Sequence, residues 1–498
     1  MISLLRAAAS VVALVLLATV APARTGPVGA GASGDPWFIE SADRFRVEAP
    51  PAGDSAETRR ELRELRRMQD ERGRRLTKRV FKWGKGPATI RWTRVALQTI
   101  RLERAAAFPT RSARALAILH LGMHDALLAA RDSRLAYDRP PPEKVDPSLD
   151  PLLPSKDSSY PDERAVVAGA AEALLTYLFP DAGPRFEGLA DAATESRLWA
   201  GVAYRSDVER GRSLGQAVAA AVIERADADG HKAPWDFAGD RPCSTESCSG
   251  ADEAHWVPTP TGFQYPPSDP MASKWETYLM ESPGQFLPPP PPSYGSGDFM
   301  DELGEVKRIS EEATRDEQEI AFLWDDGPGT FSPAGHWNEI AIDLVLNRGL
   351  GTMETARAFA LMNAAIRDAF IATWHAKYHY WSIRPVTAIR RQEIAGAPNP
   401  HHEEGWLPYL STPPFPAYPS GHTTESAAAA RVLQYLMPDR GEPDPSIADE
   451  TGPAGSIDQL AEQVAFSRLV GGIHFRSDNE AGLLLGRRIA ALAISRGP

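Results

Sequence analysis

The chain has 498 residues, of which 43% are hydrophobic and 24% charged, a composition typical of a folded protein with a large core. Its formal net charge of −12 argues against general nucleic-acid binding, because contacts with phosphate backbones need an excess of Lys and Arg. An anion site in this chain therefore depends on a local cluster of basic side chains rather than on the overall field.

The first residues are typical of a secretory signal peptide. Arg6 is the only charged residue before an apolar run from Ala7 to Val20, and Ala21-Pro22-Ala23 offers a small-residue cleavage site. The run is short for a membrane span, and an uncleaved anchor is the alternative. We expect a signal peptide at residues 1–23 and a secreted or periplasmic protein without integral membrane association.

Residues 24–104 are expected to form an N-terminal extension with a charged helix. The stretch from Glu57 to Lys78 contains many charged residues and no Gly or Pro until Gly73, which predicts an exposed helix. A solvated helix explains this pattern better than a partner-binding face.

Cysteine and histidine spacing gives little support for a metal site. Cys243 and Cys248 lie in a polar loop, where a local disulfide is expected in an oxidising compartment. Two thiols are too few for a four-thiolate zinc or iron–sulfur site. The pair His120 and His124 has helical spacing but lacks the Glu of a zinc-binding motif, so we expect core histidines there.

Helical spacing of apolar residues dominates from Val95 onward. Helices are expected around residues 116–128, 166–178, 208–223, 301–324, 338–347, 352–380, 423–436, 457–470 and 478–493. Few stretches alternate with period two, and no repeat of solenoid length is visible. The sequence predicts an all-α protein with bundle packing, comprising an N-terminal helical part, 105–300, and a C-terminal helical part, 301–498.

The first candidate motif is Lys377-Tyr-His-Tyr-Trp-Ser-Ile-Arg384-Pro385. Seven residues are nearly two helical turns, so Lys377 and Arg384 are expected on one face of a helix that Pro385 ends. Two cations on one face repel each other unless they share an anion. A solvated basic face is the alternative, and the surrounding Trp and Tyr residues argue mildly against it.

The second motif is Pro419-Ser420-Gly421-His422, directly before an Ala-rich helix. Glycine lets the backbone approach a ligand closely, and the free N–H groups and dipole of a helix start attract an anion. Ser420 adds a hydroxyl donor, and His422 can exchange a proton near neutral pH. Taken alone, this motif is equally compatible with an ordinary serine helix cap.

The third motif is Ser467-Arg468-Leu-Val-Gly-Gly-Ile-His474-Phe-Arg-Ser-Asp478. The two glycines predict a break between helices that places His474 at a cleft, and Ser477 with Glu480 predicts a capping box at the next helix start. Asp478 is expected to fix one tautomer of His474, as outer carboxylates do for metal-bound histidines. A surface arginine and a core histidine are the alternative.

Together the motifs supply three cations, a hydroxyl, a backbone cradle and two histidines. A tetrahedral or trigonal-bipyramidal oxyanion requires this set, because its equatorial oxygens need charge neutralisation and its apical positions need a nitrogen donor and a proton-exchanging group.

The patterns Lys-x6-Arg-Pro, Pro-Ser-Gly-His and Ser-Arg-x5-His-x3-Asp, in this order, resemble the signature of the phosphatidic acid phosphatase type 2/vanadium haloperoxidase superfamily. Residues 105–495 more widely resemble the secreted bacterial branch of the vanadium-dependent haloperoxidases. The resembling segments include Trp324-Asp-Asp-Gly-Pro-Gly-Thr330 and Pro414-Phe-Pro-Ala-Tyr-Pro419. The resemblance implies helical bundles of the vanadium haloperoxidase/acid phosphatase type.

The resemblance also implies a role for each matching residue. His474 would bind vanadate at an apical position, or act as the phosphorylated nucleophile of a phosphatase, and His422 would be the acid–base partner on the opposite side. The equatorial oxygens would be held by Lys377, Arg384, Ser420, Gly421 and Arg468. The pocket wall would be formed by Trp374 and Phe415, while Asp326 would pair with an oxyanion-binding arginine, Arg468 being the best candidate.

The activity that the resemblance implies is that of a haloperoxidase with vanadate as its cofactor, for which phosphate can substitute. Hydrogen peroxide would oxidise a halide, which would halogenate a small organic acceptor, and Lys377 would polarise the peroxide. The alternatives are a secreted acid phosphatase using the same pocket through a phosphohistidine and a non-catalytic oxyanion-binding protein. The motifs themselves do not separate these activities.

Overall fold

The computed structural model describes residues 35–103, 108–235, 252–260, 262–439 and 455–496. The expected signal peptide and the pair Cys243 and Cys248 lie outside these residues. Within them the only strands are β1 (Glu393–Ile394) and β2 (Ala397–Pro398), which form one short antiparallel pair. The prediction of an all-α protein is therefore confirmed.

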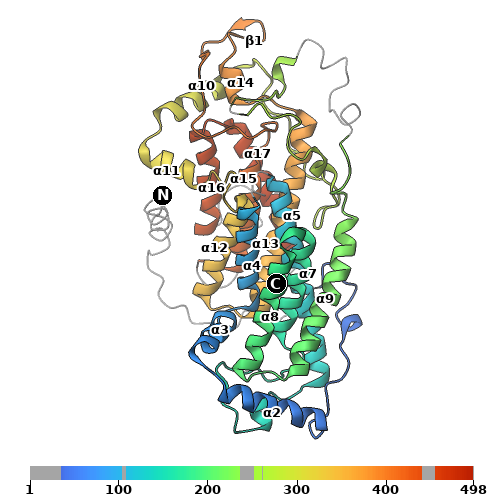
Figure 1. Cartoon of the computed structure of the whole chain (residues 1–498). Coiled ribbons are helices and arrows are strands. Elements are labelled where there is room, and N and C mark those ends of the chain that lie inside the picture. The colour runs from blue at the N-terminus through green and yellow to red at the C-terminus, as the bar shows by residue number, and fades with distance from the viewer. Residues whose placement is uncertain (1–34, 104–107, 236–251, 261, 440–454, 497–498) are drawn as a thin grey trace.

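A first bundle occupies the N-terminal half of an elongated molecule (Figure 1). Its elements are η1 (Asp43–Phe45), α2 (Ala56–Asp70), α3 (Arg74–Gly84), α4 (Ala88–Leu102), α5 (Pro109–Tyr137), α6 (Pro142–Val145), α7 (Glu163–Leu178), η3 (Pro180–Ala182), α8 (Gly183–Ala200) and α9 (Arg205–Asp227). Helices α5, α7, α8 and α9 pack together, and α2 and α3 cover the end of the bundle.

A second bundle is formed by the C-terminal half. Its elements are η4 (Asp252–Ala254), η5 (Pro270–Lys274), α10 (Gly297–Glu312), α11 (Arg315–Leu323), α12 (Ser332–Arg348), α13 (Thr352–Tyr380), α14 (Pro385–Ile389), α15 (Gly421–Leu436), α16 (Ser456–Val470) and α17 (Arg476–Ser495). The long helices α5 and α13 pack against each other along the middle of the molecule, so one apolar core runs through both bundles.

Several helix boundaries differ from the sequence prediction. The charged stretch forms two helices, because Gly73 separates α2 from α3, and α2 buries Leu65 and Met68 against the first bundle. The helix expected at 301–324 is divided into α10 and α11, since Thr314 caps a new helix start. Helices α4 and α8 were not identified from the sequence. None of the helices in the described part of the chain has the length and apolar character that crossing a bilayer requires.

Small residues bring α15 and α17 into close contact. Ala427 to Ala430 are buried on α15, and an ideal Cβ on Gly486 of α17 would lie only 2.1 Å from the Thr424 carbonyl oxygen. This approach fixes the relative position of the two helix starts, which carry the second and third sequence motifs.

Gly486→Ala is expected to destabilise the protein by about 1–3 kcal/mol, because the added methyl group forces α15 and α17 apart. Urea denaturation followed by circular dichroism measures this change. The matched control is Gly188→Ala on α8, where an added Cβ meets nothing within 4 Å. That substitution should stabilise the helix by about 0.5–1 kcal/mol. Equal effects of both substitutions would contradict the close-packing argument.

Candidate functional site: a buried oxyanion cluster

The segment 415–417 brings the two cations of the first motif together. Lys377 is fully buried, and its Nζ donates to the carbonyl oxygens of Pro416 and Ala417, each at 2.7 Å. Arg384 Nε donates to the neighbouring Phe415 carbonyl at 2.9 Å. The two side chains therefore converge on consecutive carbonyl groups of one segment.

The two cations do not share a helix face, so that prediction is wrong. Helix α13 ends at Tyr380, and Trp381 follows in the left-handed conformation, with φ of 51°. Arg384 is the N-cap residue of the separate short helix α14. The left-handed residue turns the chain before Pro385 is reached, and the carbonyl contacts then direct Arg384 toward Lys377.

Two arginine nitrogens in this region are buried without an acceptor among the described residues. Arg384 Nη1 donates to the Ile473 carbonyl at 2.8 Å, but Nη2 has no partner. Arg468 donates from Nη2 to the Trp324 carbonyl at 2.5 Å and from Nε to Ser467 Oγ at 3.0 Å, but Nη1 has no partner. A buried donor without an acceptor is costly, so these two groups are suited to donate to an anionic ligand.

The start of α15 contributes the second motif. Gly421 is the first residue of the helix, and the N–H of Ser420 donates to the Asp478 carbonyl at 2.9 Å. Ser420 Oγ lies 2.9 Å from Thr423 Oγ1. His422 Nε2 lies 3.2 Å from the Asp325 carbonyl, which assigns its proton to Nε2 and leaves Nδ1 for proton exchange.

His474 lies between α16 and α17, as predicted, and Asp478 fixes its orientation. The distance from His474 Nδ1 to Asp478 Oδ2 is 2.8 Å, so Nδ1 carries the proton and the lone pair is on Nε2. Arg384 Nη1 lies 3.1 Å from this Nε2. Asp478 also accepts from Phe475 N at 3.1 Å, so it caps α17 instead of the predicted Ser477 and Glu480.

The burial of these groups favours their neutral forms. Burial and the charge of Arg384 hold the pKa of Lys377 well below its ordinary value. The pKa of His474 is likewise well below its ordinary value, because of burial and then of the nearby Arg384, Lys377 and Arg468. Burial, with Arg468 next, has the same effect on the pKa of His422. Binding an anion would offset this accumulation of positive charge.

The carboxylate of the cluster shows the opposite shift. Burial raises the pKa of Asp478 to about 7, although Lys377 and Arg384 act to lower it. Burial lowers the pKa of Arg384 to about 9 and that of Arg468 to about 10. Both guanidinium groups therefore remain charged at neutral pH, and they are the constant positive charges of the site.

Two aromatic side chains border the cluster. The rings of Trp374 and Phe415 lie 4.8 Å apart. Lys377 Nζ and Arg384 Cζ lie 5.1 and 5.2 Å from the centre of the Phe415 ring. Both rings are buried, so they exclude water from the cations and strengthen their electrostatic interactions.

Asp326 pairs with a histidine rather than with Arg468. Both carboxylate oxygens of Asp326 lie 3.1 Å from His336 Nδ1, and the His336 ring stacks on Trp324 at 4.4 Å. Arg468 instead binds backbone carbonyls and Ser467, although Asp325 and Asp326 both act to raise its pKa. Asp325 and Asp326 thus act to raise the pKa of Arg468 through their charge, without a direct ion pair.

Glu425 is a buried acid of this region that sequence reasoning missed. It lies on α15 one turn after His422, and neither carboxyl oxygen has a partner among the described residues. Burial and the charge of Asp326 raise its pKa well above its ordinary value, while Arg468 acts against them. The signal in the sequence was a lone Glu in the Ala-rich helix, three residues after His422.

The other histidines take no part in this cluster. His120 is buried against Phe359, and burial lowers its pKa to about 3, consistent with the predicted core histidine. His379 is exposed on α13. No group of three or more metal-binding side chains occurs in the described ranges.

Comparison with known proteins finds similarity to vanadium-dependent haloperoxidases. A family model described as the VCPO second helical-bundle domain matches residues 357–497. The chain is 40% identical to the vanadium-dependent bromoperoxidase of Ascophyllum nodosum over 19% of this chain and 21% of that protein. It is 24% identical to the vanadium chloroperoxidase of Curvularia inaequalis over 69% of this chain and 64% of that protein. The chain thus spans about one fifth and just under two thirds of these curated relatives.

Solved structures extend the likeness to both bundles. A bacterial vanadium-dependent iodoperoxidase matches 80% of this chain and 96% of its own, with a TM-score of 0.60 and 26% identity. An apo-type bacterial vanadium-dependent chloroperoxidase matches 78% and 93%, with a TM-score of 0.56 and 16% identity, which shows the fold alone. Fold and site are those of a helical protein with a buried cluster of basic side chains. Residues 357–497 match the second helical-bundle domain of the vanadium-dependent haloperoxidases, and the fold of both bundles is similar to that of the bacterial iodoperoxidase.

Glu425→Gln is expected to change the pH dependence of stability. The unfolded Glu ionises above about pH 4.5, whereas the native group stays protonated, so wild-type stability falls as the pH rises through this range. Glu425→Gln has no ionisable group at this position and so does not lose this stability. As the pH rises, its free energy of unfolding should increase relative to that of the wild type by up to about 1.4 kcal/mol per pH unit.

Urea denaturation at pH 5 and pH 8 tests the prediction. The exposed Glu187→Gln on α8 is the matched control and should change stability equally at both pH values. Parallel pH profiles of Glu425→Gln and the wild type would contradict a protonated Glu425.

Proposed function

We propose that the chain is a vanadium-dependent haloperoxidase that binds vanadate at His474 and oxidises a halide with hydrogen peroxide. The observation that carries the proposal is the pair of buried nitrogens without acceptors, Arg384 Nη2 and Arg468 Nη1, in the same cluster as His474. Their chemistry fits a small oxyanion, because guanidinium groups bind oxyanion oxygens through directed hydrogen bonds.

The residues have distinct roles in this proposal. His474 offers the lone pair of Nε2, because its Nδ1 proton is bound by Asp478. Arg384, Arg468 and Lys377 would neutralise the equatorial oxygens, with the hydroxyl of Ser420 and the N–H of Gly421 as further donors. When bound, vanadate supplies Lewis-acid activation of peroxide without a change of its oxidation state.

Proton exchange is the proposed task of His422. Its lowered pKa keeps the imidazole neutral, so it can accept a proton from incoming peroxide. Lys377 is held by two carbonyls, and when a bound oxyanion restores its positive charge it can direct its third N–H toward that anion. A small organic molecule would take up the oxidised halogen. The expected signal peptide would place this reaction outside the cytoplasm.

His474→Ala is expected to abolish vanadate-dependent halogenation, because it removes the only nitrogen ligand proposed for the cofactor. The assay follows bromination of a dye by metal-free protein supplied with vanadate, peroxide and bromide. His379→Ala, which alters an exposed histidine on α13, is the matched control and should keep wild-type activity. Near-wild-type turnover of His474→Ala would refute the assignment.

A phosphatase assay on the same preparation distinguishes the alternative activity. Hydrolysis of an aryl phosphate that is inhibited by vanadate, with no bromination, would make the chain an acid phosphatase that uses the same pocket. The family relationship beyond the three motifs supports halogenation over this alternative.

Arg468→Ala is expected to weaken vanadate binding by about tenfold to 150-fold, since a hydrogen bond to a charged group contributes roughly 1.5–3 kcal/mol. Arg468→Lys keeps the charge but loses the planar donor pair, so its affinity should lie between those of the alanine variant and the wild type. Isothermal titration calorimetry with vanadate gives the three affinities. Equal affinities would show that Arg468 does not contact the anion.

A further inference from the structure

The two bundles share a sequence pattern. The segment from Tyr160 to Asp181 aligns without gaps with that from Tyr418 to Asp439, and both begin with Tyr-Pro and end with Pro-Asp. Ser196-Arg-Leu-Trp-Ala-Gly-Val-Ala-Tyr-Arg-Ser-Asp207 aligns in the same way with the third motif, Ser467 to Asp478. Helices α5 and α13 both have 29 residues and end at a left-handed residue. The first bundle is therefore an internal counterpart of the second.

Hydrogen bonds at the equivalent positions agree. Asp162 N donates to the Asp207 carbonyl at 3.0 Å, just as Ser420 N donates to the Asp478 carbonyl at 2.9 Å. The carboxylates of Asp207 and Asp478 each accept from the N–H three residues earlier, at 2.9 and 3.1 Å. The loop and helix start that hold the oxyanion cluster thus occur twice in the chain.

All three cations of the cluster have basic counterparts in the first bundle. The alignment of α5 with α13, of the Arg-Pro pairs that follow them and of the two Ser-Arg-Leu motifs identifies these positions. The pairs are Lys377 with Arg134, Arg384 with Arg139 and Arg468 with Arg197. Positive charge is therefore conserved between the two halves of this one chain.

The groups expected to receive the anion differ between the halves. Asp162-Glu163-Arg164 stands where the second bundle has Ser420-Gly421-His422, and Ala203 stands at the position of His474. Two carboxylates thus replace the hydroxyl and the glycine. The first bundle also lacks a nitrogen ligand at the histidine position.

These two carboxylates bind two of the three basic counterparts directly: Asp162 pairs with Arg197 Nε at 3.0 Å and Glu163 with Arg134 Nη1 at 2.9 Å. Arg139 pairs instead with Asp207, the counterpart of Asp478, at 2.5 Å and with Glu61 of α2 at 3.1 Å. Burial raises the pKa of Glu163, but Lys156 and Arg134 outweigh it and hold that pKa at about 2. In the described structure no buried nitrogen of Arg139 or Arg197 lacks an acceptor, in contrast to Arg384 and Arg468.

We infer that the first bundle contains a second oxyanion site, of the phosphate and vanadate class, which the chain's own carboxylates at positions 162 and 163 occupy. The wild-type chain consequently binds one oxyanion, and removal of the two negative charges opens the second site. The expectation of one bound oxyanion in the wild type rests on the proposed function. The additional oxyanion expected in the variant does not, because it concerns the first bundle alone.

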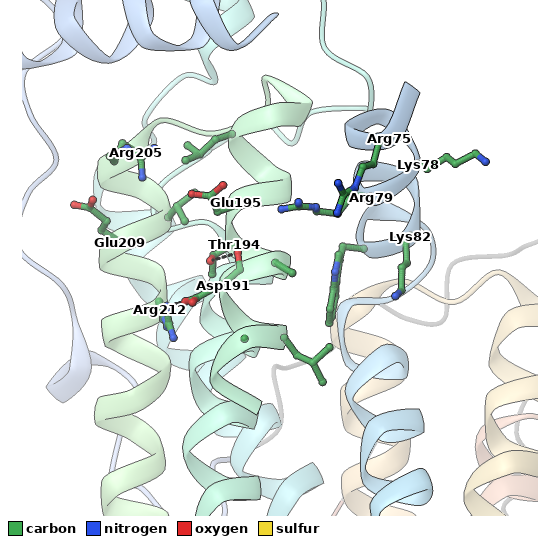
Figure 2. A pocket seen from close by; sticks show the side chains of 16 residues that line it. Arg75, Lys78, Arg79, Lys82, Asp191, Thr194, Glu195, Arg205, Glu209 and Arg212 are labelled. Atoms are coloured by element: carbon green, nitrogen blue, oxygen red, sulfur yellow. Dashed lines mark hydrogen bonds and ion pairs between the residues drawn. The ribbon is translucent and has the colours of Figure 1, made fainter. Parts of the chain in front are cut away.

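A surface cavity of the first bundle is lined by residues that flank this cluster in sequence. It has a volume of about 900 Å³ and lies between α3, α8 and α9. Figure 2 shows the basic side chains of α3 on one side and Asp191, Glu195 and Glu209 on the other. Its lining includes Leu198, the neighbour of Arg197, and Trp83, whose carbonyl accepts from Arg164 at 2.9 Å.

The test is equilibrium dialysis of the full chain with radiolabelled phosphate. Asp162→Asn/Glu163→Gln removes both charges with little change of size, and the amide oxygen introduced at position 162 can still cap α7 through the contact that Asp162 now makes to Ala165 N. Asp70→Asn/Glu71→Gln, exposed residues at the end of α2, removes the same charge and is the matched control. We expect one phosphate per chain for the wild type and the control, and two for the Asp162/Glu163 variant.

Each outcome is decisive. A folded Asp162/Glu163 variant that binds no more phosphate than the wild type overturns the inference, as does a wild type that binds two. A wild type that binds none contradicts the proposed function, while a gain of one phosphate in the variant still supports the second site. If the variant does not fold in chloride, recovery of helical circular dichroism in phosphate of equal ionic strength supports the inference, and absence of recovery overturns it.

Discussion

The geometry of the oxyanion cluster depends on Asp478, which joins three parts of the site through one residue. Its carboxylate binds His474 Nδ1 and Phe475 N, so it fixes the imidazole and the start of α17 together. Its carbonyl accepts from Ser420 N, which holds the start of α15 in place. A displacement of Asp478 would therefore move the proposed nitrogen ligand and the backbone cradle at the same time. The close packing at Gly486 maintains this arrangement along the two helices.

The equivalent arginines of the two bundles are satisfied in physically different ways. In the second bundle Arg384 and Arg468 donate mainly to backbone carbonyls, which are those of Phe415, Ile473 and Trp324. A carbonyl satisfies a donor without cancelling its charge, so the positive potential remains for an anion. In the first bundle carboxylates such as Asp162 both satisfy the donors and neutralise them. The choice of acceptor, rather than the number of cations, thus distinguishes the proposed binding site from a structural ion-pair cluster.

Much of this organisation could be predicted from the sequence, because periodicity identified most helices and the three motifs named the residues that meet in the cluster. Three details were wrong because they depend on local backbone geometry. The left-handed Trp381 separates Arg384 from the helix of Lys377, Asp478 rather than Ser477 caps α17, and Asp326 binds His336. Glu425 was missed since its burial arises from packing between distant helices. The internal repeat was also overlooked, because the matching residues are mostly those of packing, while those of the chemistry differ.

The contact between α5 and α13 has a consequence for the ancestry of the chain. These helices are equivalent members of the two halves, and they meet through equivalent positions. Ala117 and Leu121 of α5 pack with Ala360 and Ala364 of α13 in one small cluster. Contact between equivalent positions of two like surfaces is also the arrangement found in an isologous homodimer. The molecule thus resembles a dimer of two similar bundles joined in one polypeptide.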